Sequence, residues 1–362
     1  MKINRDLLLG KINLATKFIS NRISSSTALQ GIFLKKEKNK LFIHSTNLNS
    51  YYKTYLKTEG DNDFEIVVEP KKISEFLSLL LPGEVDFMFK EKNLVISQQK
   101  NRGIFPIIAA KDFPLLKKIT SEKQKINIKI LKEIFPIISF AASVDETRPV
   151  LTGVNFVGID EITQIVATDG FRLSLYNLKT RLPISSVIIP SSFLSEVLRI
   201  VEVDEIEFSF EEEEKVLTFY VNEDEFSTRL IEGEYPPYQR VIPKESTTQV
   251  VLDKDEFLRN VKLVSVFARE FSNIVLLEIE KNGIKFSPKT NIKEENISFQ
   301  EAEIKGEPIK IAFNSKFLID FLSKTNSKKI KIELLRPDSP TVFKMVDNND
   351  FLHIIMPVRV QD

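Results

Sequence analysis

The feature that most constrains the fold of this chain is an internal repeat of about 120 residues, present three times. Segments 67–89 and 187–210 share one pattern: a proline followed by a stretch with periodically spaced apolar residues, then an acidic turn, then a predicted strand in which apolar and polar residues alternate. Segment 311–335 repeats this pattern with Asn314 in place of the proline. Pro70 and Pro190 lie 120 residues apart, and Asn314 follows 124 residues later. Since solenoid repeats span only roughly 20 to 50 residues, each of these longer copies is expected to bury its own core.

The first half of the repeat agrees with the second. Apolar residues spaced by 4, 3 and 3 positions recur in each copy, a spacing that places them on one helical face. The predicted faces are Leu8, Ile12, Ala15 and Phe18; Ile130, Ile134, Ile137 and Phe140; and Phe257, Val261, Val264 and Phe267. Each helix is followed by a pair of predicted strands, and the copies end alike in the strings DFPLL at 112–116 and EYPPY at 234–238.

The repeat predicts an α+β fold of three similar domains in tandem. The polar stretches 116–125 and 242–249 suggest boundaries that give domains 1–120, 121–246 and 247–362. Pro70 and Pro190 suit the first turn of a helix, where a missing N–H costs nothing, and Asn314 or Ser315 can cap the third such helix.

Composition excludes several kinds of chemistry. Lys plus Arg and Asp plus Glu number 51 each, so no net charge steers the whole chain toward nucleic acid or membrane. The chain has no Cys and only His44 and His353, which excludes disulfides, thiolate nucleophiles and Cys/His zinc sites. We expect neither metal nor cofactor. Without a signal-like N-terminus or an apolar run of about 18 residues, the expected location is the cytoplasm.

Enzymatic motifs are absent from the sequence. There is no phosphate-binding G-x-x-x-x-G-K-[ST], no G-x-S-x-G and no H-E-x-x-H. The carboxylates Asp145 and Glu146 and the run at 211–214 are interpreted as solvated loop or turn residues. The residues alone are also consistent with two other functional classes. One is a monomeric three-domain protein-binding scaffold, and the other is a hydrolase that uses two converging carboxylates.

Five strings, in order, carry a resemblance to a known family. They are ETRPVLTGV at 146–154, ATDGFRLS at 167–174, EGEYPPYQRVIP at 232–243, FNSKFLIDFL at 313–322 and IIMPVRV at 354–360. Across a triplicated chain they resemble the bacterial DNA sliding clamps, the β subunit of DNA polymerase III. Three features depart from that pattern: Phe171 stands where many members have His, Val360 replaces a usual Leu, and Gln361 with Asp362 extend past the typical end.

The resemblance implies a non-catalytic processivity factor that forms a homodimeric ring of six similar domains around duplex DNA, with helices inside and sheets outside. Size supports this arrangement. A domain of this length has a diameter of roughly 35 Å; six in a ring leave a hole of about 35 Å, whereas three leave only about 5 Å. Because a duplex is roughly 20 Å across, two chains are needed to surround it. ATP-driven opening of the ring is then expected to belong to a separate loader.

The resemblance also implies a groove between the second and third domains that binds short peptides of the replicative polymerase, the clamp loader, repair polymerases and mismatch-repair proteins. The matching positions are Leu151, Thr168, Gly170, Phe171, Arg172, Leu173, Pro236, Arg240, Val241, Phe271, Asn314, Phe317, Ile354, Ile355, Met356, Pro357, Val358 and Arg359. An apolar floor with a deformable Met suits Leu and Phe side chains, and the arginines suit polar flanks.

Basic residues on the predicted helices are expected to face the DNA, while acidic residues gather in strand regions. A surface with these basic residues would attract the duplex electrostatically without binding it tightly. The predicted DNA-facing residues are Lys11, Lys17, Arg22, Lys71, Lys72, Lys132, Arg148, Arg199, Arg259, Lys262, Arg269, Lys316 and Lys324.

Overall fold

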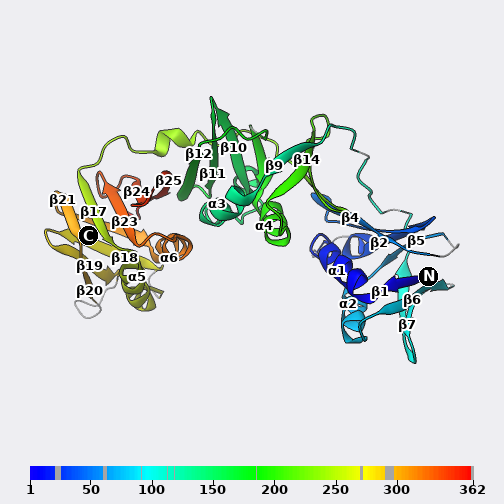
Figure 1. The fold of residues 1–362 in the computed structure, drawn as a ribbon. Coiled ribbons are helices and arrows are strands. Elements are labelled where there is room, and N and C mark those ends of the chain that lie inside the picture. The colour runs from blue at the N-terminus through cyan, green and yellow to red at the C-terminus, as the bar shows by residue number, and fades with distance from the viewer. Residues whose placement is uncertain are drawn as a thin grey trace. The chain divides into compact units, whose positions relative to one another are not determined.

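The computed structural model describes residues 1–20, 26–59, 63–90, 92–111, 113–117, 119–184, 186–269, 272–289 and 297–359. Within them one order of elements, strand, helix, four strands, helix and three strands, occurs three times (Figure 1). The predicted α+β repeat is therefore confirmed. The third copy differs in one respect, since two short strands occupy the place of one strand in the other copies.

The elements of the first two copies have these bounds. The first copy comprises β1 (Lys2–Asn4), α1 (Arg5–Thr16), β2 (Ile32–Glu37), β3 (Lys40–Thr46), β4 (Ser50–Lys57), β5 (Phe64–Val68), α2 (Pro70–Leu79), β6 (Glu84–Lys90), β7 (Asn93–Gln98) and β8 (Asn101–Ile108). The second comprises β9 (Gln124–Asn127), α3 (Lys129–Ser139), β10 (Gly153–Ile159), β11 (Ile162–Thr168), β12 (Arg172–Leu178), β13 (Val187–Pro190), α4 (Ser191–Ile200), β14 (Glu205–Glu211), β15 (Val216–Val221) and β16 (Asp224–Arg229).

The third copy and three short 3₁₀ turns complete the described chain. The copy comprises β17 (Thr248–Asp253), α5 (Lys254–Ala268), β18 (Ile274–Glu280), β19 (Gly283–Pro288), β20 (Ser298–Glu301), β21 (Glu303–Gly306), β22 (Ile309–Asn314), α6 (Ser315–Lys324), β23 (Lys329–Leu334), β24 (Thr341–Met345) and β25 (Asn348–Ile355). The 3₁₀ turns are η1 (Thr27–Gln30), η2 (Pro149–Thr152) and η3 (Tyr238–Val241).

Strand pairing joins each copy to the next by a single rule. The fourth strand of the first copy, β4, pairs antiparallel with β16, the last strand of the second copy. The fourth strand of the second copy, β12, pairs in the same way with β25, the last strand of the third. Within the described residues this yields sheets of twelve, nine and four strands, the last being β20, β19, β18 and β22.

The chain divides into two compact units, and the division falls inside the middle copy. Residues 1–129 and 196–230 form one unit, and residues 130–195 and 231–362 form the other. The reason is the pairing just described: the β14 to β16 half of the middle copy continues the sheet of the first copy, and its β10 to β13 half continues that of the third.

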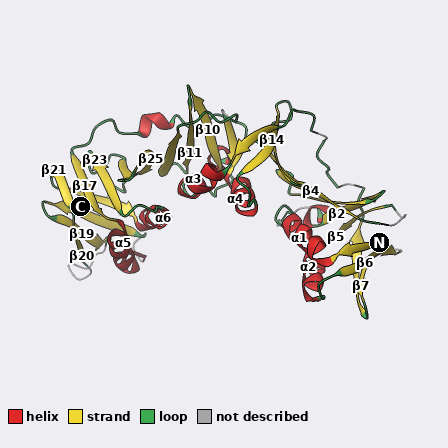
Figure 2. Ribbon diagram, viewed as in Figure 1, coloured by secondary structure: helices red, strands yellow, loops and turns green. Residues whose placement is uncertain are grey.

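Helices lie against the sheets in each unit. In the first unit α1 and α2 lie side by side, with α1 against β3 and β4; in the second, α5 and α6 lie side by side (Figure 2). The helix starts follow local rules. Pro70 is the first residue of α2, and the Asn314 side chain accepts the Lys316 N–H at 3.0 Å to cap α6. Pro190 instead ends β13, one residue before α4, so its first-turn placement was wrong by one position.

The predicted helical faces are correct in the first copy, shifted on α3, and correct on α5 except at its last position. Leu8, Ile12 and Ala15 are buried on α1. On α3, Ile130 and Phe140 are only half-buried, while Leu131, Phe135 and Ile138 join Ile134 and Ile137 in the core. The cause is a broad apolar stripe that admits two neighbouring registers. On the longer α5 the predicted Phe267 is 49% exposed and Ala268 is buried instead.

Candidate functional site

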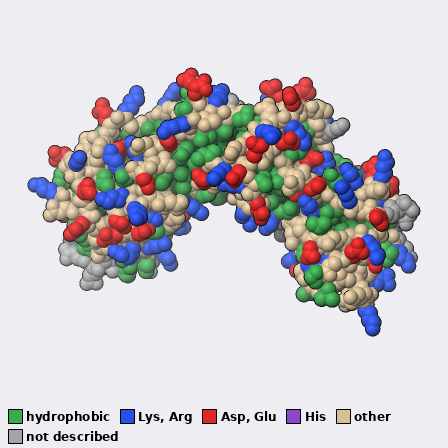
Figure 3. All heavy atoms as spheres, in the orientation of Figure 1, with side chains coloured by type: hydrophobic (Ala, Val, Ile, Leu, Met, Phe, Trp, Pro, Cys, Tyr) green, Lys and Arg blue, Asp and Glu red, His purple; other side chains and the backbone are tan. Residues whose placement is uncertain are grey.

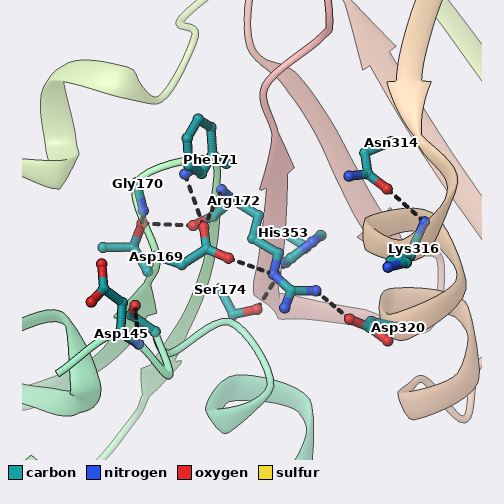
Figure 4. Close-up of polar contacts among 12 residues, drawn as sticks. Asp145, Asp169, Gly170, Phe171, Arg172, Ser174, Asn314, Lys316, Asp320 and His353 are labelled. Carbon is teal, nitrogen blue, oxygen red and sulfur yellow. Dashed lines mark hydrogen bonds and ion pairs between the residues drawn. The ribbon is translucent and has the colours of Figure 1, made fainter. Parts of the chain in front are cut away.

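A tight turn between β11 and β12 forms the centre of the candidate site (Figure 4). The Thr168 hydroxyl donates to the Arg172 carbonyl at 2.6 Å and accepts the Gly170 N–H at 3.1 Å. The Asp169 carboxylate accepts the N–H groups of Phe171 and Arg172 at 2.9 and 3.0 Å. Gly170 has φ +93°, a left-handed conformation that suits glycine. The turn therefore holds Phe171 outward, where it is 58% exposed.

Arg172 ties this turn to α6. Its guanidinium donates from Nε to Asp169 Oδ2 at 3.0 Å and from Nη1 to Asp320 Oδ2 at 2.6 Å. The same group lies 4.7 Å from the ring centroid of Phe317, and Phe171 stacks on Phe317 with centroids 6.5 Å apart. The sequence predicted Arg172 as a partner for peptide flanks, but missed Asp169 and Asp320, which already bind it. Arg172 and Asp320 are 148 residues apart, so no local pattern could reveal the pair.

The C-terminal segment forms a second wall of the site. The Met356 N–H donates to the Phe171 carbonyl at 2.8 Å, and the Val358 N–H donates to the Ala312 carbonyl of β22 at 2.8 Å. Met356, Pro357 and Val358 are half-buried, whereas Arg359 is exposed. The structure thus brings Phe171, Arg172, Phe317 and the 356–358 backbone together.

Several other predicted groove residues belong to the protein core. Leu151, Thr168, Leu173, Ile354 and Ile355 are buried. Leu173 and Ile354 pack in one cluster with Tyr238. The side chains of these residues lie in the core next to the exposed turn.

The segment that follows β16 covers one side of that cluster. Tyr238 is buried and donates its hydroxyl to Gln164 Oε1 at 2.6 Å, which anchors η3 against β11. Pro236, Arg240 and Val241 remain exposed around it. Tyr238 was not predicted, although the string EYPPY contains it, because an aromatic residue in a polar linker gives no sign of the sheet it packs on. The predicted Phe271 lies outside the described residues, as do Val360, Gln361 and Asp362.

His353 lies under the site and is fully buried (Figure 4). Its Nδ1 is 2.8 Å from the Ser174 hydroxyl, and its ring stacks on Phe321 with centroids 4.9 Å apart. Burial, together with the nearby Arg172 charge, lowers the pKa of His353 well below its ordinary value of 6.5. The imidazole is therefore neutral in the folded protein.

Replacing His353 by phenylalanine is expected to reduce the pH dependence of stability, while the buried His44, whose pKa is lowered to about 3, keeps its own contribution. Below pH 6.5 the unfolded chain binds a proton at this histidine that the folded chain cannot bind, so the wild type loses stability as the pH falls. The loss approaches about 1.4 kcal/mol per pH unit between the unfolded and the folded pKa of His353. Thermal unfolding midpoints at pH 8 and pH 5 measure it. The non-titrating variant Phe351→Leu should keep the wild-type difference, and an undiminished difference in His353→Phe would contradict the assignment.

The predicted DNA-facing residues have different environments. Most lie on helices or directly at their ends: Lys17, Lys71, Lys72, Lys132, Arg199, Arg259, Lys262, Arg269, Lys316 and Lys324. Lys11 is bound to Asp224 at 2.7 Å with a side chain only 18% exposed. Arg148 was wrongly placed on a helix; it precedes η2 and lies beside Gly170. Arg22 lies outside the described residues. Basic and acidic side chains are interspersed on the face shown in Figure 3.

The acidic run at 211–214 is only partly solvated: Glu212 and Glu213 are exposed, as predicted, whereas Glu211 and Glu214 bind other parts of the chain. Glu211 accepts the N–H groups of Thr120 and Ser121 at 3.1 and 3.3 Å, and Glu214 pairs with Lys117 at 2.6 Å. Across the described ranges, His, Asp and Glu side chains nowhere form a group of three that could hold a metal ion. None of the described helices is long and apolar enough to cross a membrane.

Comparisons with known proteins agree with this fold along its length. Residues 1–117, 125–237 and 239–359 match, in order, the N-terminal, central and C-terminal domains of the DNA polymerase III beta subunit. Beta sliding clamps of Halalkalibacterium halodurans and Staphylococcus epidermidis are 28% and 27% identical, each over 99% of this chain and 98% of the relative. The beta subunits of Thermotoga maritima and Streptococcus pneumoniae have TM-scores of 0.91 and 0.90, at 26% and 25% identity, over 99% of both chains.

A triplicated α+β chain with this pairing rule and these structural likenesses is a DNA clamp. The three consecutive domain matches make the assignment specific. The chain belongs to the DNA polymerase III beta subunit family, the bacterial β sliding clamps. It is therefore a non-catalytic processivity factor that works on DNA with DNA polymerase III.

Proposed function

We propose that two copies of this chain close into a ring around duplex DNA, and the observation that carries the proposal is the strand-pairing rule. The rule joins the fourth strand of one copy of the repeat to the last strand of the next. It leaves the fourth strand of the third copy, β20, and the last strand of the first copy, β8, without such a partner in the described residues. A second chain supplies both.

The two unpaired strands have the character of an interface. Residues 101–106 of β8 pair only with β7, and β20 pairs only with β19, so each has one open edge in the described part of the chain. Apolar side chains are exposed on both: Ile104 is 57% exposed and Phe299 is 50% exposed. Open apolar edges favour pairing with another chain. Head-to-tail pairing of β8 with β20 of a second copy, repeated by a twofold axis, closes without free ends.

The ring is proposed to consist of domains 1–120, 121–246 and 247–362 from each chain, working in the cytoplasm on the chromosome. Phe171, Arg172, Phe317 and Met356, with the exposed Pro236, Arg240 and Val241, are proposed to receive peptide motifs of the polymerase, the loader and repair proteins. The support is their convergence around one exposed turn. The exposed helix lysines and arginines are proposed to face the duplex and to hold it by weak electrostatic attraction.

The test is retention on DNA of different topology. Protein loaded by its own clamp loader onto a nicked circular plasmid should remain bound in about 0.5 M salt, because a closed ring needs no phosphate contacts to stay on. Cutting the plasmid once should release it within minutes as it slides off the ends. Gel filtration of the protein–DNA complex measures both states. Equal loss of the protein from circular and linear DNA would indicate ordinary electrostatic binding and contradict the ring.

A further inference from the structure

The turn between β3 and β4 has the same hydrogen bonds as the turn at 168–172. The Thr46 hydroxyl donates to the Ser50 carbonyl at 2.9 Å and accepts the Leu48 N–H at 2.9 Å. The Asn47 side chain accepts the N–H groups of Asn49 and Ser50 at 3.1 and 2.8 Å. Leu48 has φ +77°, matching Gly170. The junction of the first and second copies therefore contains the same structural parts as the groove junction.

The registers of the two junctions show which positions correspond. At the groove junction Leu173 pairs with Ile354 and Leu175 with Leu352. At the first junction the pairs are Tyr51 with Ser227 and Lys53 with Glu225. The apolar set closes into a packed cluster beneath Tyr238. The corresponding set at the first junction is largely polar.

Because of that difference the first junction stays open. A cavity of about 360 Å³ lies between its strands and the segment that follows β8. Its walls are the strand residues 44–45, 51–53, Tyr220, Glu225 and Ser227, and its cover is formed by described residues between 113 and 123. The volume falls in the range of small-ligand pockets, roughly 300 to 1,000 Å³.

The interior offers both apolar surface and an unused polar group. Phe113 is buried and stacks on Phe33 with centroids 5.2 Å apart, so one end of the cover is firmly held. The Ser45 hydroxyl lines the cavity from a residue only 1% exposed and has no hydrogen-bond partner in the described structure. A buried hydroxyl without a partner is costly, and a ligand group that reaches it would remove that cost.

Three lysines and one glutamate line the cavity, and each lysine also contacts a glutamate. Lys53, Lys117 and Lys123 line the cavity against a single carboxylate, Glu225, which already accepts both of its hydrogen bonds from Lys53. Lys117 and Lys123 each contact one glutamate of the β14–β15 hairpin, while their side chains are 81% and 47% exposed. An ammonium group has three donors, so each retains capacity for an incoming carboxylate. Burial and the Lys53 charge lower the pKa of His44 to about 3, so its ring is neutral at pH 7.

We propose that this cavity is a second peptide site, which takes one aromatic or large apolar side chain of an extended segment flanked by acidic residues. This second site is separate from the proposed groove. The inference rests on the proposed function of the groove only for the expectation that the ligand is a peptide. Ser45 would bind a polar group of the segment at the cavity floor, and the lysines would bind its carboxylates at the opening.

A tryptophan reporter tests the site. The chain contains no tryptophan, so Leu115→Trp, at a 50% exposed position on the cavity cover, introduces a single fluorophore. The probe is the peptide acetyl-Asp-Phe-Glu-amide, titrated into the full-length protein. The expected result is a saturable fluorescence change that acetyl-Lys-Phe-Lys-amide does not produce. No saturable change, or an equal one with the basic peptide, would overturn the proposal, as would equal competition by free benzoate, which would indicate a small-carboxylate site instead.

Two variants separate this site from the groove. Ser227→Ile introduces the residue found at the corresponding groove-junction position, so it should fill the cavity and weaken the probe at least tenfold. It also removes the buried hydrogen bond that the Thr218 hydroxyl donates to Ser227 at 2.8 Å, so its thermal stability is measured first. Should that variant fold poorly, Lys117→Ala at the opening should weaken the probe severalfold. The groove variant Arg240→Ala/Met356→Ala should leave the reporter response unchanged. Loss of the response in the groove variant alone would show that the probe binds the groove, and would overturn the second site while leaving the proposed function intact.

Discussion

Replacing Arg240 and Met356 together by alanine is expected to abolish stimulation of DNA polymerase III while the dimer stays intact. Arg240 is exposed and Met356 is half-buried, and neither belongs to the packed cluster beneath the site. Truncating an interface anchor costs about 1 to 2 kcal/mol. The pair should therefore weaken peptide binding by roughly 30-fold or more. Product length in primer extension on a long single-stranded template measures the effect.

A matched control is available in the same unit. Arg336 has a side chain 71% exposed, and Val346 is 49% exposed; the double variant Arg336→Ala/Val346→Ala removes the same kinds of groups at two positions that are not among the site residues. This control should leave product length unchanged. The groove assignment fails if the Arg240 and Met356 variant also retains full product length, or if both double variants shorten it equally.

The repeat could be predicted from sequence because its signals are local. Helical and strand periodicities depend on neighbours within a few residues, and three copies of each pattern reinforce one another. The first-turn position of Pro70 and the cap at Asn314 were predicted for the same reason. The shifted face of α3 shows the limit of such signals. Where nearly every helix position is apolar, as in 130–138, periodicity no longer determines which residues point to the core.

The site itself could be predicted only in part. Its members were identified by resemblance, yet their environments depend on contacts between residues far apart in sequence. Leu173 and Ile354 belong to the core because β12 pairs with β25, and Arg172 is satisfied because α6 brings Asp320 to it. The open cavity at the first junction arises in the same way. Ser227 and Lys53 are ordinary strand residues until the register places them where the groove junction has Ile354 and Leu175.

The strand-pairing rule predicts a second large effect, which is the loss of the dimer. Changing Ile104 on β8 and Phe299 on β20 to aspartate is expected to convert the protein into a folded monomer. Each copy of the proposed interface would then bury two unpaired carboxylates, and each uncompensated buried charge costs about 3 to 5 kcal/mol. The dissociation constant of the dimer should rise by at least roughly 1,000-fold. Sedimentation at about 1 μM should give the 41.6 kDa mass of one chain, where the wild type gives twice that mass.

The consequence for function follows from topology. A monomer cannot close around the duplex, so the Ile104→Asp/Phe299→Asp protein should leave circular DNA as fast as linear DNA and should give short primer-extension products. Its peptide site should still bind, because Arg172 lies on β12, in a sheet that contains neither β8 nor β20. The control Val144→Asp/Val346→Asp introduces the same charges at positions 97% and 49% exposed, and should remain dimeric. A dimer that survives aspartate on both edges would show that β8 and β20 do not form the seam.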